Sequence, residues 1–519
     1  MRKRLFLMLV IILFAVIGVL PLLFMLFKSV TADGELNLSV FTEILATKHQ
    51  WILMYHSLIL SSAVALLSTF AGVLLGILFG KTDLPFRRFF TVLFVIPLLI
   101  PPYIFAISWS DLLAGLNYES FFGLMGCIMV LFSVFLPVPM LLTIFFLHTV
   151  DPRLEEAGLL AASWKEVMTG ITLPLLIPAV ILSFMLVFIL SFGEFSVANF
   201  LRYDVYPVES FTLFAAFYDA GPAIAAALPL AGAALLFLLA GELFLRKRSY
   251  RPYLFSRYKV LTVKLGPLRR RLAFAIALFG FVIVIVPMII LLVNSGGLEN
   301  YLEAFRRAGD SMFRSLGFAA TTATLMTFFG FFIGYLVHTK ALAIWRMADA
   351  VTIFLFALPG TVIGIGLISL WNTPWTNIVY GTPLIVIFGL LAKYTALTGK
   401  VSAVWLARIP SSMEEAAQAA GAGWFRRIVF IVIPLMWRGL AVAWIVGYIF
   451  SLRDTSVTML VYPPGQDTLP VRIFTLMANG SPELIAALCV IMITITLLPA
   501  ALLWLILKTT AAKVSLWQR

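Results

Sequence analysis

Apolar stretches of about twenty residues alternate with short polar segments along the whole chain of 519 residues. A helix of that length crosses the roughly 30 Å hydrocarbon core of a bilayer. The pattern predicts an all-α multi-pass membrane protein with about twelve spans, six on either side of a basic segment. The expected spans lie near 5–27, 56–79, 89–110, 123–147, 174–200, 222–245, 272–294, 315–338, 347–371, 382–406, 434–452 and 482–507.

The composition agrees with this class and gives no sign of a catalytic or metal centre. Hydrophobic residues make up 62% of the chain and charged residues 12%. The two cysteines, Cys127 and Cys489, stand far apart inside apolar stretches, and the four histidines lack ligand spacing. We therefore expect no disulfide framework, no metal site, no bound cofactor and no catalytic residues.

The basic residues predict the orientation of the chain. Most of the 37 Lys and Arg residues fall in alternate loops, which places those loops and both termini in the cytoplasm. The opening MRKRLFLMLVIILFAVIGVL is expected to be an uncleaved first transmembrane helix. The net charge of +13 then reflects loops beside anionic lipid, and nucleic acid is not an expected partner.

Two halves of the sequence are similar to each other. TFAGVLLG at 69–76 matches TFFGFFIG at 327–334, and SFGEFSV at 191–197 matches SLRDTSV at 451–457. Several such matches at a nearly constant offset indicate a duplicated six-helix unit. An even number of helices gives both copies the same orientation, so the repeats are expected to be parallel.

These matches predict three regions. The first repeat is expected at 1–245 and the second at 272–519, each with about six transmembrane helices. Residues 246–271, which are rich in Lys and Arg, would form a basic cytoplasmic linker between them.

A small-residue, acid-led segment stands between two spans of each repeat. In IPSSMEEAAQAAGAGWFRRIVFIVIPL (409–435), Ser411 and Glu414 have the spacing of a helix-capping box, and Gly421 is suited to end the helix. A shorter version, EEAGLLAAS, occupies 155–163. By themselves these segments predict a capped surface helix, a bend and a second short helix.

The spacing within the second segment resembles the EAA loop of ATP-binding-cassette importer permeases. That loop reads EAA, three residues, G, nine residues, I, one residue, LP; here Ile433 stands in the place of Leu. The two loops would span 151–174 and 410–434. In the first, Ala161 replaces the glycine, and counting back from Pro174 selects Glu155, not Glu156, as the motif acid, which leaves the register open by one residue.

The resemblance implies a type I importer, or MetI-like, permease fold and a transport subunit that is not an enzyme. A separate cytoplasmic ATPase dimer would hold ATP and magnesium, and an extracytoplasmic binding protein would deliver the substrate. The chain would lie in the bacterial cytoplasmic (inner) membrane. The residues expected to couple to the ATPase are Glu155, Glu156, Ala157, Ala161, Glu414, Glu415, Ala416, Ala417 and Gly421.

The substrate is indicated by a second resemblance. SLRDTSVTMLVYPPGQDTLPVRIFTLM at 451–477 is similar to the corresponding segment of ferric-iron permeases, which implies Fe³⁺. Importers of thiamine, phosphonate or polyamine share the architecture and stay open as alternatives. A secondary ion-coupled transporter is the alternative from another class, and a membrane enzyme is a third.

Charged residues inside two equivalent spans are candidates for the substrate path. Charged groups in hydrocarbon are costly and usually functional, and carboxylates suit a hard cation. An alternative is that Arg453 pairs with Glu194 or Asp454 and only holds the helices together; Lys393, also within a span, is expected to have a structural partner. The path candidates are Ser191, Glu194, Ser451, Arg453 and Asp454.

Overall fold

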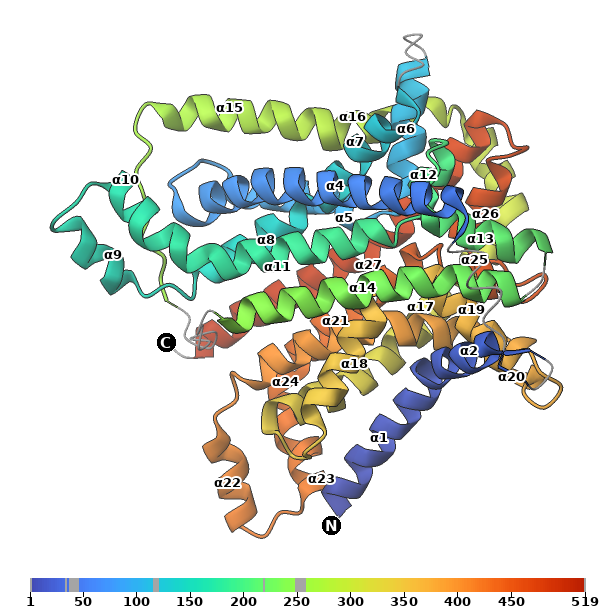
Figure 1. Ribbon diagram of the computed structural model, residues 1–519. Helices are drawn as coiled ribbons and strands as arrows, with labels where there is room; N and C mark the ends of the chain where they lie inside the picture. The colour runs from blue at the N-terminus through green and yellow to red at the C-terminus, as the bar shows by residue number, and fades with distance from the viewer. Residues whose placement is uncertain are drawn as a thin grey trace. The chain divides into compact units, whose positions relative to one another are not determined.

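The structure is a computed structural model that describes residues 2–32, 35–36, 46–114, 121–217, 220–247 and 258–517. Helices make up most of this part of the chain (Figure 1). Its strands are a short antiparallel pair, β1 (Thr31–Ala32) and β2 (Glu35–Leu36).

The spans expected from hydropathy are present as helices. Ten helices in the described ranges are long and apolar enough to cross a membrane, and two bent pairs raise the number to 12. The prediction of an all-α multi-pass protein is therefore confirmed. Some boundaries differ: the span expected at 174–200 ends at Phe192, and the one expected at 315–338 is the second half of a 42-residue helix.

The described helices pack into two compact units that do not coincide with the sequence halves. Unit 1 comprises Met1–Ile44, Ser210–Ala231 and Ser295–Arg519, and unit 2 comprises Leu45–Glu209 and Gly232–Asn294. Two helices, α13 (Tyr206–Phe217) and α14 (Ala220–Lys247), have residues in both units.

Unit 2 holds most of the first repeat. Its elements are α4 (Lys48–Lys81), α5 (Arg87–Leu99), α6 (Pro102–Ala114), α7 (Leu124–Phe135), α8 (Pro137–Leu147), α9 (Pro152–Leu159), α10 (Trp164–Val167), the π-helical η2 (Met168–Thr172), α11 (Leu173–Phe192), α12 (Ser196–Phe200), α15 (Leu268–Gly280), the π-helical η3 (Phe281–Ile285) and α16 (Val286–Asn294).

Unit 1 holds most of the second repeat. Its elements are α1 (Arg2–Gly18), α2 (Leu20–Val30), α17 (Leu298–Thr339), α18 (Trp345–Ala357), α19 (Gly360–Trp371), α20 (Asn377–Tyr380), α21 (Leu384–Leu406), α22 (Ser411–Ala419), α23 (Trp424–Arg427), the π-helical η4 (Ile428–Val432), α24 (Ile433–Arg453), α25 (Thr458–Val461), α26 (Leu469–Leu476) and α27 (Pro482–Trp517).

The first helix of each repeat packs in the unit built mainly from the other repeat. In unit 1, α1 packs on α17 and α21, and α2 packs on α19. In unit 2, α15 packs on α5, where the Phe94 and Phe279 rings lie 5.7 Å apart, and α16 packs on α6. Each expected repeat thus contributes its first helix to the unit built mainly from the other, which the similarity of the two sequence halves does not reveal.

Two spans are broken near their middle. Helices α5 and α6 meet at a bend of 98°, and α18 and α19 at a bend of 107°. A proline follows each break residue, Ile100 or Leu358, and both residues have the extended backbone that a following proline enforces. A proline thus accompanies the bend in both broken spans.

A wide helical turn precedes a proline in each repeat. The Leu173 N–H bonds to the Met168 carbonyl, and the Ile433 N–H to the Ile428 carbonyl, five residues back in each case. Because Pro174 and Pro434 cannot make the regular bond, the π turn accommodates them without a break. The second short helix expected in each loop is therefore continuous with the following span.

The part of the basic linker that the structure describes is fixed to unit 2. The Val263 N–H donates to the Lys81 carbonyl at 2.8 Å, and the Tyr258 N–H donates to the His148 carbonyl at 2.8 Å. Residues 248–257 of the expected linker lie outside the described ranges.

Candidate functional site

The first acid-led loop begins with two well-capped short helices. The Asp151 carboxylate accepts the Arg153 N–H at 3.0 Å, and Pro152 takes the first helical position of α9. At the start of α10, Ser163 and Glu166 form a capping box, with the Ser163 N–H donating to the Glu166 carboxylate at 2.7 Å. The capping box of the first loop thus stands at the start of α10, and not at the start of the acid-led helix α9.

Glu155 points from α9 into the end of unit 2. It is 1% exposed, forms an ion pair with the equally buried Lys81 at the end of α4, and accepts the Thr172 hydroxyl at 2.5 Å. The Lys81 ammonium also lies 5.8 Å from the Trp164 ring. Glu155 therefore fastens the loop to the helices, and its carboxylate is buried, although the sequence had placed Glu155 among the residues expected to couple to the ATPase.

The exposed side of α9 and of the bend that follows it includes small and apolar side chains beside the acid Glu156. Glu156, Ala157 and Ala161 are exposed, and Leu160 between them is 91% exposed. This part of the loop therefore exposes apolar surface beside the Glu156 carboxylate.

The second loop starts differently from its prediction. Helix α22 begins at Ser411 after Pro410 and has no side-chain cap, so the expected Ser411–Glu414 capping box does not form. Ser411 is already the first helical residue, which removes it from the capping position. Glu414, which is half-buried, instead accepts the Tyr335 hydroxyl of α17 at 3.2 Å.

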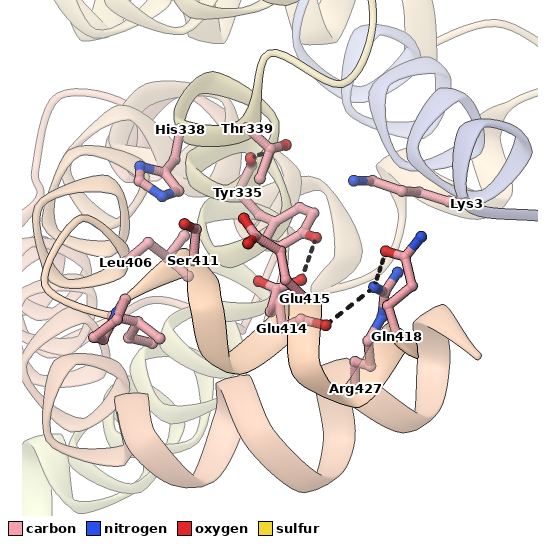
Figure 2. A pocket seen from close by; sticks show the side chains of 12 residues that line it. Lys3, Tyr335, His338, Thr339, Leu406, Ser411, Glu414, Glu415, Gln418 and Arg427 are labelled. Carbon is pink, nitrogen blue, oxygen red and sulfur yellow. Dashed lines mark hydrogen bonds between the residues drawn. The ribbon is translucent and has the colours of Figure 1, made fainter. Parts of the chain in front are cut away.

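Arg427 ties the two arms of the second loop together. Its Nη1 donates to the Glu414 carbonyl at 3.3 Å and also to the Gln418 side chain (Figure 2). Glu415 and Ala416 are exposed, and Ala417 is half-buried. The second loop thus has the same division as the first, with one acid facing the helices and the next acid facing outward.

The bend of the second loop requires a glycine. Gly421 has φ +81°, a left-handed conformation that costs other residues about 1–2 kcal/mol. The Ala422 N–H returns to the Ala417 carbonyl at 2.9 Å and the Gly421 N–H to the Gln418 carbonyl at 3.0 Å, which is the Schellman pattern.

The first bend needs no glycine, and the helix before it is one residue shorter: α9 has 8 residues and α22 has 9. The Ala162 N–H bonds to the Gly158 carbonyl at 2.9 Å, and Ala161 is not left-handed. Counted from the first residue of each helix, Glu155 in α9 is equivalent to Glu414 in α22, and Glu156 is equivalent to Glu415. This difference in helix length explains why counting back from the proline does not align the two pairs of acids.

A cavity of about 220 Å³ lies beneath the second loop, within unit 1. Lys3 of α1, Thr339 and Tyr335 of α17, and Glu414 of α22 line it together with Arg427 (Figure 2). In unit 2, the residue at the end of the equivalent helix is Lys81, whose side chain fills the space beside Glu155.

The acids expected in the substrate path cap short helices. Glu194 accepts the Ser196 N–H at 2.8 Å, at the start of α12. Asp454 accepts the Val457 and Thr458 N–H groups at 2.9 and 3.1 Å, at the start of α25. The two units therefore use an acid at the end of the same span for the same backbone purpose.

Asp454 has an additional set of partners. It is 4% exposed, accepts the Tyr394 hydroxyl at 2.7 Å and pairs with the Lys393 ammonium at 3.4 Å. The structural partner expected for Lys393 is thus Asp454. The role of this cluster in holding α21 to the end of α24 follows directly from the contacts.

The remaining path candidates are buried or partly shielded. Arg453 is 8% exposed, with its guanidinium 5.2 Å from the Phe450 ring. The Ser451 hydroxyl lies 3.9 Å from the Met326 sulfur, and Ser191 is 2% exposed.

The structure adds residues that the sequence had not singled out. Lys81, Tyr335 and Lys3 line the inner side of the two loops. Lys81 carried one available signal, since it is a charged residue at the end of a long apolar helix, but its partner is distant in sequence.

Comparison with known proteins finds similarity to permeases of binding-protein-dependent transport systems. Residues 68–250 match the family described as binding-protein-dependent transport system inner membrane component, which has the MetI-like fold. The chain is 26% identical over 459 residues to the putative ferric transport system permease protein FbpB 1 of Haemophilus influenzae, covering 81% of this chain and 71% of that protein.

Two further relatives have different extents. The Fe(3+)-transport system permease protein FbpB 2 of Haemophilus influenzae is 24% identical over 496 residues, covering 91% of this chain and 92% of that protein. The putative 2-aminoethylphosphonate transport system permease protein PhnV of Salmonella typhimurium is 28% identical over 204 residues, covering 39% of this chain and 76% of that protein.

The buried ion pair can be tested by removing one partner. Glu155→Ala leaves the Lys81 ammonium buried without a counter-charge, at a typical cost of about 3–5 kcal/mol. We expect a lower thermal unfolding midpoint in detergent than for Glu156→Ala, whose carboxylate is exposed, and substantial recovery when Lys81→Met and Glu155→Met are combined. Equal midpoints for Glu155→Ala and Glu156→Ala would contradict the anchoring role.

The two helix-capping acids should respond unequally to neutralisation. An amide oxygen can still accept the backbone hydrogen bonds in Glu194→Gln and Asp454→Asn, but only the second change deprives the partly buried Lys393 of its counter-charge. We expect Asp454→Asn to lower the thermal midpoint and Glu194→Gln to leave it nearly unchanged. Lost substrate uptake in Glu194→Gln at a normal midpoint would assign that carboxylate to the path instead.

Proposed function

We propose that this chain, which belongs to the family of binding-protein-dependent transport system inner membrane components, is the permease of an ATP-driven importer that carries Fe³⁺ into the cytoplasm. The iron assignment rests on how much of the chain the ferric permeases match. The ferric permeases match across both repeats, whereas the phosphonate permease matches a smaller part of the chain.

The two acid-led loops are the proposed docking sites for a separate ATPase dimer. Each has an outward acid, Glu156 or Glu415, beside alanines that let a partner approach closely. Leu160 is 91% exposed and would gain about 1.5–3 kcal/mol if a partner buried it completely. Glu155 and Glu414, in contrast, support the loops from inside.

The basic residues support an orientation with both loops in the cytoplasm and both termini on the same side. In this arrangement the extracytoplasmic binding protein delivers its cargo at the opposite face of the bacterial inner membrane. ATP and magnesium would be held by the partner ATPase.

The continuity of the helices suggests how movement of a loop reaches the membrane. Each loop leads without a break into one long helix, Trp164–Phe192 in unit 2 and Trp424–Arg453 in unit 1. At the far end, Glu194 or Asp454 holds the next short helix to that span. We infer that closure of the ATPase dimer shifts these helices as stiff levers and alternates access to the path.

Docking can be tested at the glycine that shapes the second loop. Gly421→Val forces a β-branched residue to φ +81°, whereas Gly423→Val is a matched control because Gly423 has φ −63° and open space around its Cα. We expect Gly421→Val to reduce co-purification of the ATPase with the tagged permease about tenfold. Equal ATPase recovery in the two variants would argue against docking at this bend.

The transport function can be tested in proteoliposomes that contain the permease, its ATPase and its binding protein. We expect ATP-dependent accumulation of radioactive Fe³⁺, and no accumulation with a non-hydrolysable ATP analogue. Uptake of thiamine, a phosphonate or spermidine in place of iron would reassign the substrate. Uptake driven by an ion gradient without ATP would reject the importer assignment.

A further inference from the structure

The inward acid of the second loop lacks the lysine that neutralises its counterpart in the first loop. Aligning TFAGVLLG (69–76) with TFFGFFIG (327–334) places Thr339 at the position of Lys81, and each is the last residue of its helix. The Thr339 hydroxyl donates to the Tyr335 carbonyl at 2.7 Å and lines the cavity. The lysine side chain that fills this place in unit 2 is thus replaced by open space beside Glu414.

A different lysine reaches that space from the start of the chain. The Lys3 ammonium lies 5.0 Å from the centre of the Tyr335 ring, and the hydroxyl of the same tyrosine bonds to Glu414. Figure 2 shows Lys3 and Tyr335 on facing sides of the cavity. Lys3 belongs to α1, the helix that the first repeat contributes to unit 1.

An aromatic cluster fixes the start of α1 against the second loop. The Phe6 ring lies 4.9 Å from Phe332 of α17, 5.8 Å from Trp424 and 5.2 Å from Phe425. Trp424 is also hydrogen-bonded to Tyr335: its Nε1–H donates to the Tyr335 hydroxyl at 3.2 Å. Because Lys3 is less than one helical turn from Phe6, the cluster holds its side chain at the mouth of the cavity.

Arg427 cannot supply the same support, although it also lines the cavity. Its Nη1 bonds go to the Glu414 carbonyl and the Gln418 side chain, so they join α22 to the start of the following helix. These contacts lie within the loop and move with it. A charge on α1, in contrast, belongs to the membrane helices against which the loop must be positioned.

We propose that Lys3 is the positioning residue of the second loop and does for Glu414 what Lys81 does for Glu155. The N-terminal helix of the first repeat then sets the position of the docking loop of the second repeat. The cavity gives the Lys3 side chain room to approach Glu414 as the loop moves. The role of this contact in transport rests on the proposed function, but the contact itself can be measured in the permease alone.

The first test follows the position of the loop without any partner. Cys127 and Cys489 are buried, so Ala416→Cys provides an exposed thiol on the second loop and Ala157→Cys the matched thiol on the first. We expect Lys3→Met to raise the maleimide labelling rate of the second thiol at least threefold and to leave that of the first unchanged. Arg4→Met, which removes an exposed neighbouring charge, should change neither rate.

Rescue by a lysine at the equivalent position separates charge from general packing. Lys3→Arg should behave as the wild type, and Thr339→Lys added to Lys3→Met should restore the slow labelling rate, because it provides the ammonium where the first repeat has it. The idea is overturned if Lys3→Met labels like Arg4→Met, or if both rescues fail while the protein remains monodisperse.

The same variants test the consequence for transport in the reconstituted importer. We expect Lys3→Met to lower the amount of substrate moved per ATP hydrolysed at least threefold, and Thr339→Lys to reverse the loss. Absence of ATPase binding by the wild-type permease would reject the proposed function while leaving the labelling result valid. A labelling change with unaltered transport per ATP would reject the role of Lys3 in transport.

Discussion

A carboxylate at the base of a surface loop must be neutralised or hydrogen-bonded by the helices beneath it, and this requirement positions both acid-led loops. Glu155 meets it with the Lys81 ammonium and the Thr172 hydroxyl, and Glu414 meets it with the Tyr335 hydroxyl. The next residue in each helix, Glu156 or Glu415, points in a different direction and is exposed. The two adjacent acids thus belong separately to the attachment of the loop and to its exposed surface.

The π-helical turns extend the effect of this attachment into the membrane part of each unit. A regular helix would be disturbed at Pro174 or Pro434, and a break there would separate the loop from its span. The wider turn keeps Trp164–Phe192 and Trp424–Arg453 continuous. At the far end of each span, Glu194 or Asp454 accepts backbone N–H groups at the start of the next short helix.

Sequence patterns predicted the spans, the duplication and the position of both loops, because these depend on hydropathy and local spacing. The direction of Glu155 could not be predicted, since it depends on Lys81, 74 residues away along the chain. The register between the loops was hidden by a difference in helix length, since α9 has 8 residues and α22 has 9. The capping box failed for a local reason: α22 begins at Ser411, directly after Pro410. The packing of α1 in unit 1 and of α15 in unit 2 could not be inferred, because similarity between two parts of a sequence does not show which helices pack together.

That packing explains how two loops with the same motif acquire different supports. The motif residues lie mainly on the outer surface of each loop, where a similar partner would require similar side chains. The inner surface is free to differ because it meets different helices: Glu155 is held by residues of its own repeat, whereas the surroundings of Glu414 include Lys3, and those of Trp424 include Phe6, both from the other repeat. A resemblance between the loops therefore describes what they present to a partner, and the contacts beneath them determine how firmly and by which helices each is held.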